Sequence, residues 1–285
     1  MDCAVPSTSN RSLVTHTMDS AAPSIEGRDR WVDHPKGRIL TRTWFSSEET
    51  TRAAPIILLH DSLGCIELWR DFPSQLAARV GRDVVAYDRL GFGRSDRRVE
   101  RPSLEFVAEE ASQYLPHVLE QLDLDRYALL GHSVGGGMAI ESASRAGDNC
   151  VALITVAAQV FPEEKTLKGI RAAREAFAHI DQQERLARYH GEKTQWVLDA
   201  WIENWLSIGF ASWSVVKALT TIQCPALAIH GEEDEYGSSV HAKLIASHCG
   251  TGSRAVLLPG VGHVPHREQP ARVLELVQDF LSGVP

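Results

Sequence analysis

The pentapeptide at residues 131–135 constrains the fold of this chain more than any other segment. It reads Gly-His-Ser-Val-Gly, follows the apolar residues 127–130, and precedes the small residues 136–140. A glycine two positions before and two positions after a serine is typical of a sharp turn from a strand into a helix, because glycine tolerates crowding and unusual dihedral angles. The pattern therefore predicts that Ser133 is presented as a nucleophile at the end of a strand.

Two later segments can supply the partners that such a serine requires. A serine hydroxyl is a weak nucleophile at neutral pH, so it needs a base, and the base needs an orienting carboxylate. The apolar residues 225–230 run into Gly-Glu-Glu-Asp-Glu at 231–235, and residues 255–258 run into Pro-Gly-Val-Gly-His at 259–263. The chain order serine, acid, histidine is the one expected for α/β-hydrolases.

From roughly residue 30 to its C-terminus the chain resembles the α/β-hydrolase superfamily, in its cap-bearing esterase and carbon–carbon-bond hydrolase branch. Beyond the pentapeptide, three segments match the family's oxyanion loop, its D-x-x-G-x-G-x-S turn and its histidine loop: His-Asp-Ser-Leu-Gly at 60–64, Asp-Arg-Leu-Gly-Phe-Gly-Arg-Ser at 88–95, and Gly-His at 262–263. The resemblance implies the α/β class: a doubly wound, mostly parallel eight-stranded sheet with a helical cap inserted after the sixth strand.

The resemblance also implies a role for individual residues. Ser133 matches the nucleophile, and His263, directly after a strand and a glycine, matches the base in preference to His266, which is expected to begin the last helix. Among the four consecutive carboxylates at 232–235, the family pattern selects Asp234, three residues after the glycine that ends the strand. The remaining carboxylates are expected on a solvated face.

The oxyanion hole is expected to consist of two backbone N–H groups, those of Val134 and Ser62. Asp61 stands where the family usually has glycine. Because a carboxylate beside a developing oxyanion is unfavourable, its side chain is expected to point away, toward an arginine.

The pattern of strands and helices divides the chain into three parts. Residues 1–24 are rich in Ser, Thr, Pro and Ala without an apolar stretch, and are predicted to be a disordered extension. Residues 25–159 and 220–285 are predicted to form the core, and residues 160–219, which lack strand signals, the helical cap. The cap holds four of the seven tryptophans. These rings form either its own core or an apolar substrate tunnel, and we expect Trp196, Trp201 and Trp205 to contact substrate.

Composition limits the partners and the compartment. A formal net charge of −8 argues against nucleic acid or an anionic membrane as a partner, and no apolar run reaches the roughly 20 residues that span a bilayer. Five scattered cysteines, an odd number without metal-ligand spacing, are expected as reduced thiols in a cytoplasmic protein. We expect a small-molecule substrate, no metal and no cofactor, and leave a homodimer open.

The expected chemistry is hydrolysis of a small to medium, mainly uncharged ester through an acyl-enzyme. The same residues leave alternatives open, because this superfamily hosts several activities. These are a carbon–carbon-bond hydrolase, a thioesterase, a lactonase, a ligand receptor with slow turnover, and a lyase that uses Ser133 and His263 as acid–base groups.

Overall fold

A computed structural model describes residues 25–46 and 53–285 of the chain, so the predicted N-terminal extension lies outside the described residues. Eight strands form one sheet in the order β1-β2-β4-β3-β5-β6-β7-β8. Their bounds are β1 Gly27–Val32, β2 Ile39–Trp44, β3 Ile56–Leu59, β4 Val84–Tyr87, β5 Tyr127–His132, β6 Cys150–Val156, β7 Ala226–Gly231 and β8 Arg254–Leu258.

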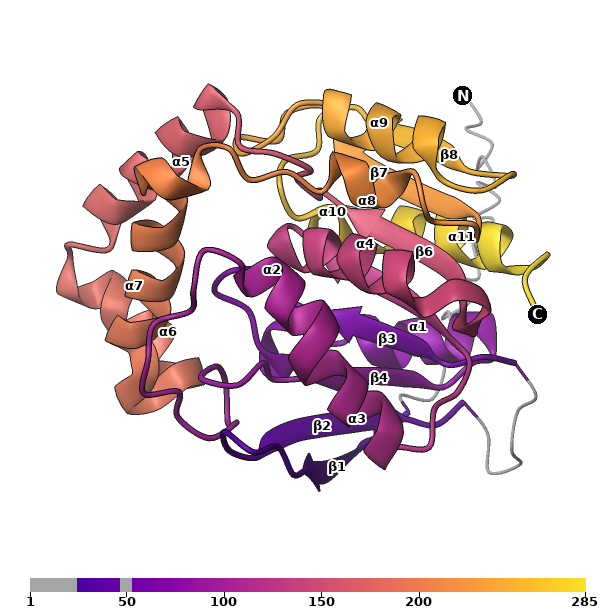
Figure 1. The fold of residues 1–285 in the computed structure, drawn as a ribbon, viewed down its shortest axis with the longest axis horizontal. Coiled ribbons are helices and arrows are strands. Elements are labelled where there is room, and N and C mark those ends of the chain that lie inside the picture. Colours follow the sequence, from indigo (N-terminus) through magenta and orange to yellow (C-terminus); the bar gives the residue numbers. More distant parts are fainter. Residues whose placement is uncertain (1–24, 47–52) are drawn as a thin grey trace, which may run out of the picture.

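The sheet is parallel from β4 to β8 and antiparallel at one edge, where β2 pairs with both β1 and β4. Helices cover both faces, and Figure 1 shows α2, α3 and α4 on one face with α1 and α11 on the other. The predicted doubly wound, mostly parallel eight-stranded sheet is confirmed. The helices of the core are α1 Phe72–Val80, α2 Phe106–Glu109, α3 Leu115–Gln121, α4 Val134–Ala146, α9 Val240–His248, α10 Pro265–Glu268 and α11 Pro270–Leu281.

The short apolar strands explain the two helical layers. In β3 all four residues are buried, and successive side chains point to opposite faces of a sheet. Ile57 and Leu59 join the core cluster that includes α4, whereas Ile56 and Leu58 join the cluster that includes α1 and α11. A strand that is apolar on both faces needs a helix on each, which is the doubly wound arrangement.

Apolar residues recur at helical spacing over residues 104–122, but this segment is not one continuous α-helix. α2 is followed by a π-helical turn over Glu110–Tyr114 and then by α3. Pro116 stands in the first turn of α3, and a proline inside a helix removes one hydrogen bond and collides with the carbonyl group four residues earlier. The wider turn accommodates that proline, which hydrophobic spacing alone does not reveal.

The segment between β6 and β7 is helical, as its composition indicated. It contains α5 Glu164–Ala176, α6 Ile180–His190, α7 Thr194–Trp205 and α8 Val216–Leu219. Figure 1 shows α5, α6 and α7 gathered beside the sheet, while α8 lies near α4. His190 ties this insert to the core: its Nδ1 accepts from the Gly93 N–H at 2.9 Å and its Nε2 donates to the Leu63 carbonyl oxygen at 3.0 Å.

Among the residues that the structure describes, no helix combines the length and the apolar character needed to cross a bilayer.

Candidate active site

Ser133 stands on the sharp turn between β5 and α4. A Cβ atom on Gly131 would lie 2.2 Å from the Gly135 carbonyl oxygen, and one on Gly135 would lie 2.2 Å from the Leu59 carbonyl oxygen. Glycine is therefore required at both positions by close backbone contact. The left-handed dihedral angles, which the pattern assigned to the glycines, fall on Ser133 itself, at φ 54° and ψ −124°. Such a conformation costs about 1–3 kcal/mol and is typical of functional sites.

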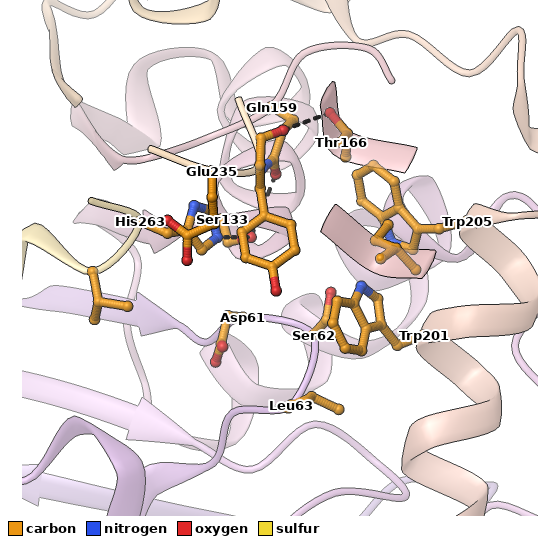
Figure 2. A pocket seen from close by; sticks show the side chains of 13 residues that line it. Asp61, Ser62, Leu63, Ser133, Gln159, Thr166, Trp201, Trp205, Glu235 and His263 are labelled. Atoms are coloured by element: carbon orange, nitrogen blue, oxygen red, sulfur yellow. Dashed lines mark hydrogen bonds between the residues drawn. The ribbon is translucent and has the colours of Figure 1, made fainter. Parts of the chain in front are cut away.

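Ser133, His263 and Asp234 form one hydrogen-bonded chain. His263 Nε2 lies 3.0 Å from Ser133 Oγ, and His263 Nδ1 lies 2.9 and 3.0 Å from the two carboxylate oxygens of Asp234. Figure 2 shows the imidazole of His263 beside Ser133. The three residues follow the carboxyl ends of β5, β8 and β7, which meet at one edge of the sheet. The structure thus brings together the three residues that the sequence selected.

Asp234 is fully buried and receives several donors. Its Oδ1 accepts from the N–H groups of Tyr236 at 2.8 Å and Gly237 at 3.1 Å, and its Oδ2 lies 3.2 Å from His230 Nε2. Burial raises the pKa of Asp234, but the hydrogen bond and the charge of His263 outweigh burial, so the net pKa lies below its usual value. The carboxyl is therefore ionised at neutral pH and can orient the imidazole. The neighbouring Glu232 and Glu233 are exposed, as expected.

The loop that carries His263 is held by two further side chains. Glu268, at the end of α10, accepts from the Gly262 N–H at 2.7 Å and from the Val264 N–H at 2.9 Å. His132 Nε2 donates to the His263 carbonyl oxygen at 2.9 Å. Burial lowers the pKa of His132 to about 4, so its imidazole is neutral and keeps a single N–H for this contact. The backbone on both sides of His263 is therefore fixed from outside the loop.

A cavity of about 250 Å³ opens above Ser133. Figure 2 shows its aromatic wall, with Trp201 and Trp205 facing the side that holds Ser133 and His263. The aromatic rings favour an apolar ligand, while Asp61 and Glu235 put negative charge at the rim. The lining residues are Asp61, Ser62, Leu63, Ser133, Gln159, Thr166, Ile170, Trp201, Trp205, Glu235, Tyr236, His263 and Val264.

The three tryptophans that were expected to contact substrate lie in two different environments in the structure. Trp201 and Trp205 line the cavity, but Trp196 does not. The Trp196 ring packs edge-on against Phe92 with 5.5 Å between ring centroids, and its Nε1 donates to the Glu100 carbonyl oxygen at 3.3 Å. The expectation that Trp196 contacts substrate is therefore corrected: it fastens the insert to the loop after β4.

The two backbone N–H groups expected for the oxyanion hole lie in suitable places. Ser62 lines the cavity, and Val134 begins α4, where the first N–H groups have no acceptor inside the helix and the helix dipole is positive. Ser62 and Val134 also line a small adjoining cavity together with Trp201 and Trp205. Across residues 25–46 and 53–285, neither N–H donates to another protein group.

Asp61 borders the cavity but turns away from Ser133, as Figure 2 shows. A Cβ atom on Gly64 would lie 2.1 Å from Asp61 Oδ1, so the carboxylate folds back over that glycine. The expected arginine contact is made by the backbone instead, because Arg89 Nη2 donates to the Asp61 carbonyl oxygen at 2.8 Å. Arg89 thereby holds the loop that carries Ser62, although the side chain of Asp61 is not its partner.

Sequence reasoning missed the polar residues that complete the cavity wall. Gln159 is buried, and its Oε1 lies 3.4 Å from Ser133 Oγ. Thr166 Oγ1 donates to the Tyr236 carbonyl oxygen at 2.6 Å, which joins α5 to the loop of Asp234. Burial raises the pKa of Tyr236 to about 12, so its phenol is neutral. The available signal was position, since Gln159 follows the fully buried strand β6 at the edge where Ser133 lies.

Comparison with known proteins identifies the class that this fold and this arrangement define. The profile of the alpha/beta hydrolase family matches residues 56–276. Since this match covers more than half of the chain, the protein belongs to the alpha/beta hydrolase family.

Individual proteins match this chain either over a short segment or at low sequence identity. The chain is 37% identical over 92 residues to a proline iminopeptidase of Lactobacillus delbrueckii subsp. lactis, a match that covers 32% of this chain and 31% of the relative. The solved proline iminopeptidase of Mycobacterium smegmatis superposes with a TM-score of 0.66 at 22% identity, over 90% of this chain and 98% of that one. The enol-lactonase of Burkholderia xenovorans LB400 gives a TM-score of 0.68 at 19% identity, over 89% and 100%. At these identities the structural likeness shows the fold alone.

Proposed function

We propose that the protein is a serine hydrolase that cleaves small to medium, mainly uncharged esters through an acyl-enzyme. The observation that carries the proposal is the 3.0 Å contact between His263 Nε2 and Ser133 Oγ, completed by Asp234 on the opposite nitrogen of the same imidazole. This is the arrangement of a nucleophile, its base and the orienting acid. It faces a cavity large enough for a small substrate.

In the proposed acylation step, His263 Nε2 takes the Ser133 proton while Oγ attacks the carbonyl carbon of the ester. The N–H groups of Ser62 and Val134 stabilise the resulting oxyanion. The bond to the leaving group then breaks, and His263 returns the proton to the leaving oxygen. Asp234 stays ionised and holds the imidazole in the tautomer that this step requires.

The charge around the cavity supports uncharged substrates. Asp61 and Glu235 line the cavity, and no lysine or arginine is among its lining residues. A substrate carboxylate would meet two like charges there and gain no ion pair. Salt screens solvated charges over about 10 Å, so this discrimination is expected to weaken as the ionic strength rises.

Labelling with a fluorophosphonate, followed by steady-state kinetics on a panel of esters, thioesters, lactones and vinylogous diketones, tests the proposal. We expect labelling of the wild type at Ser133, no labelling of Ser133→Ala, and turnover of esters. His263→Ala should remove activity as severely as Ser133→Ala, because the triad acts as a unit. The exposed His248→Ala on α9 is the matched control.

Other outcomes would redirect the assignment. Labelling with negligible turnover across the whole panel would indicate a ligand receptor. Turnover of the diketones in preference to the esters would indicate a carbon–carbon-bond hydrolase, and a product formed without addition of water would indicate a lyase. Ester activity in Ser133→Ala within about tenfold of the wild type would overturn the assignment of the nucleophile.

A further inference from the structure

Gln159 occupies a position beside the nucleophile that the triad leaves unexplained. It lies three residues after the end of β6, is 2% exposed, and lines the cavity with Ser133. The chain reaches this position through Ala157, whose φ of 51° lies in the left-handed region that alanine rarely adopts. Strain of this kind persists where surrounding contacts enforce it, and it is concentrated at functional sites. The fold therefore holds Gln159 against Ser133 at some cost.

The hydrogen-bonding capacity of the Gln159 amide exceeds what its protein contacts use. Ser133 has one hydroxyl proton, and His263 Nε2 at 3.0 Å is placed to accept it. The contact between Gln159 and Ser133 Oγ is longer, at 3.4 Å. An amide side chain offers two donor hydrogens and an oxygen with two lone pairs. Within the part of the chain that the structure describes, Ser133 is the single side-chain partner of this amide, so it can bind a molecule in the cavity.

The strand order puts Gln159 on the proton-transfer side of the nucleophile. The loop of Ser62 follows β3, Ser133 follows β5, Gln159 follows β6, and the loops of Asp234 and His263 follow β7 and β8. Since β5 lies between β3 and β6, the Ser62 N–H of the expected oxyanion hole and Gln159 are on opposite sides of Ser133. A molecule that exchanges a proton with His263 must approach from the side of Gln159.

We propose that Gln159 orients the water that hydrolyses the acyl-enzyme, an inference that rests on the proposed serine hydrolase function. Once Oγ is acylated it has no proton, so His263 Nε2 is free to accept one from water. Gln159 forms a hydrogen bond to this water. The water oxygen then bonds to the acyl carbon while one proton of the water moves to His263 Nε2. The bond between the acyl carbon and Oγ then breaks, and His263 gives the proton to Oγ. The products are the carboxylic acid and free Ser133.

Pre-steady-state kinetics with p-nitrophenyl acetate separate the two half-reactions in the variant Gln159→Met, which has a side chain of similar length without the amide. The p-nitrophenol burst reports acylation, and the following linear phase reports deacylation. We expect the burst rate constant to stay within about threefold of the wild type and the steady-state rate to fall at least about tenfold. The exposed Gln195→Met on α7 is the matched control and should change neither phase.

Two further measurements distinguish water orientation from a merely structural role. Hydroxylamine, a stronger nucleophile, should restore the turnover of Gln159→Met toward the wild-type value. Gln159→Glu keeps an oxygen acceptor, so its deacylation rate should lie between those of Gln159→Met and the wild type. Its burst and steady-state phases, compared with those of the wild type, test the proposal if the methionine variant fails to fold.

An equal loss in burst and steady state, or no loss in either, would overturn the assignment of Gln159. A wild type that forms no acyl-enzyme would instead refute the proposed function, and this inference with it. Circular dichroism of each variant verifies that the fold is retained.

Discussion

His132, the residue directly before Ser133, donates a hydrogen bond to the backbone carbonyl oxygen of His263 over 2.9 Å. The turn that presents Ser133 is thus joined to the loop that presents His263 by a contact that does not involve the side chains of Ser133, His263 and Asp234. Glu268 complements this contact from the other side, through the N–H groups of Gly262 and Val264. The position of His263 therefore depends on residues outside the hydrogen-bonded chain of Ser133, His263 and Asp234.

Glu268→Gln should lower kcat by roughly tenfold and leave KM nearly unchanged. The substitution replaces one carboxylate oxygen with an NH2 group that faces a backbone N–H, so His263 shifts relative to Ser133, and small displacements of a catalytic group are costly. Steady-state kinetics on one ester measure the effect. Glu275→Gln, in the exposed pair with Arg272, is the control. Equal kcat values for the two variants would show that Glu268 does not position the base.

Asp234→Asn should reduce turnover on the order of 10⁴-fold, because the amide no longer fixes the tautomer of His263. Glu232→Gln and Glu233→Gln are the matched controls, since both carboxylates are exposed and should matter little. Glu235→Gln should act mainly on KM because Glu235 lines the cavity. A loss in Glu232→Gln or Glu233→Gln as large as that in Asp234→Asn would mean that the acid has been assigned to the wrong carboxylate.

A series of p-nitrophenyl esters from acetate to palmitate should show a rise and then a fall in kcat/KM. Each buried methylene contributes about 0.8 kcal/mol, or several-fold, until the cavity of about 250 Å³ is filled. Trp201→Ala enlarges this cavity and should move the optimum to longer chains. Trp196→Ala, which alters the same insert outside the cavity, should leave the optimum in place. A flat profile, or a preference for a carboxylated analogue, would contradict the proposed apolar pocket.

The stability of the protein should fall steeply between pH 6.5 and pH 4. Burial lowers the pKa values of His132 and His190 to about 4. Unfolded histidine titrates near 6.5, so as the pH falls the unfolded state binds protons first. The contribution of these two neutral histidines to the free energy of unfolding is therefore complete above about pH 6.5. It falls by about 3 kcal/mol per residue as the pH decreases to 4, and it changes no further below pH 4.

Urea unfolding at several pH values measures this dependence. His190→Gln should be less stable than the wild type at pH 7, because its bonds to Gly93 and Leu63 are altered. Its stability should depend less on pH, since glutamine does not titrate. Parallel curves for the two proteins would show that His190 does not contribute to the acid sensitivity.

Most of the sheet could be predicted from sequence because its central parallel strands are short, buried on both faces and followed by loops with recognisable residues. Prediction from sequence was less accurate where several residues of one type were candidates for the same role, or where tertiary contacts determine the position of a side chain. Trp196, Trp201 and Trp205 share one segment, yet only the packing of α7 against the loop after β4 separates Trp196 from the cavity. The π-helical turn at Glu110–Tyr114 was hidden because hydrophobic spacing reports which face is buried rather than how the backbone is wound.

The site was predictable where chemistry demands a residue type at a fixed place on a strand end, as for Ser133, Asp234 and His263. Gln159 and Glu268 carry no such demand. Gln159 contacts Ser133, which lies 26 positions earlier in the chain, so only the fold brings the two together. Glu268 contacts the Gly262 N–H through a loop geometry that local sequence does not specify. Asp61 illustrates the same limit, since its side chain was expected to contact an arginine, whereas Arg89 contacts its backbone carbonyl oxygen instead.

The order of the strands has a consequence for behaviour on heating. β8, which carries the loop of His263, is three strands away from β5, which carries Ser133. With neighbouring strands about 4.8 Å apart, the loop must reach back about 14 Å across β7 and β6 to place the imidazole. It is attached there by a few hydrogen bonds, to the side chains of His132 and Glu268 and to the Glu233 N–H, whereas the strands are held by whole ladders. Warming should therefore detach the loop of His263 while the sheet is still folded. The highest temperature at which the protein is active should then be limited by this local detachment rather than by unfolding of the core.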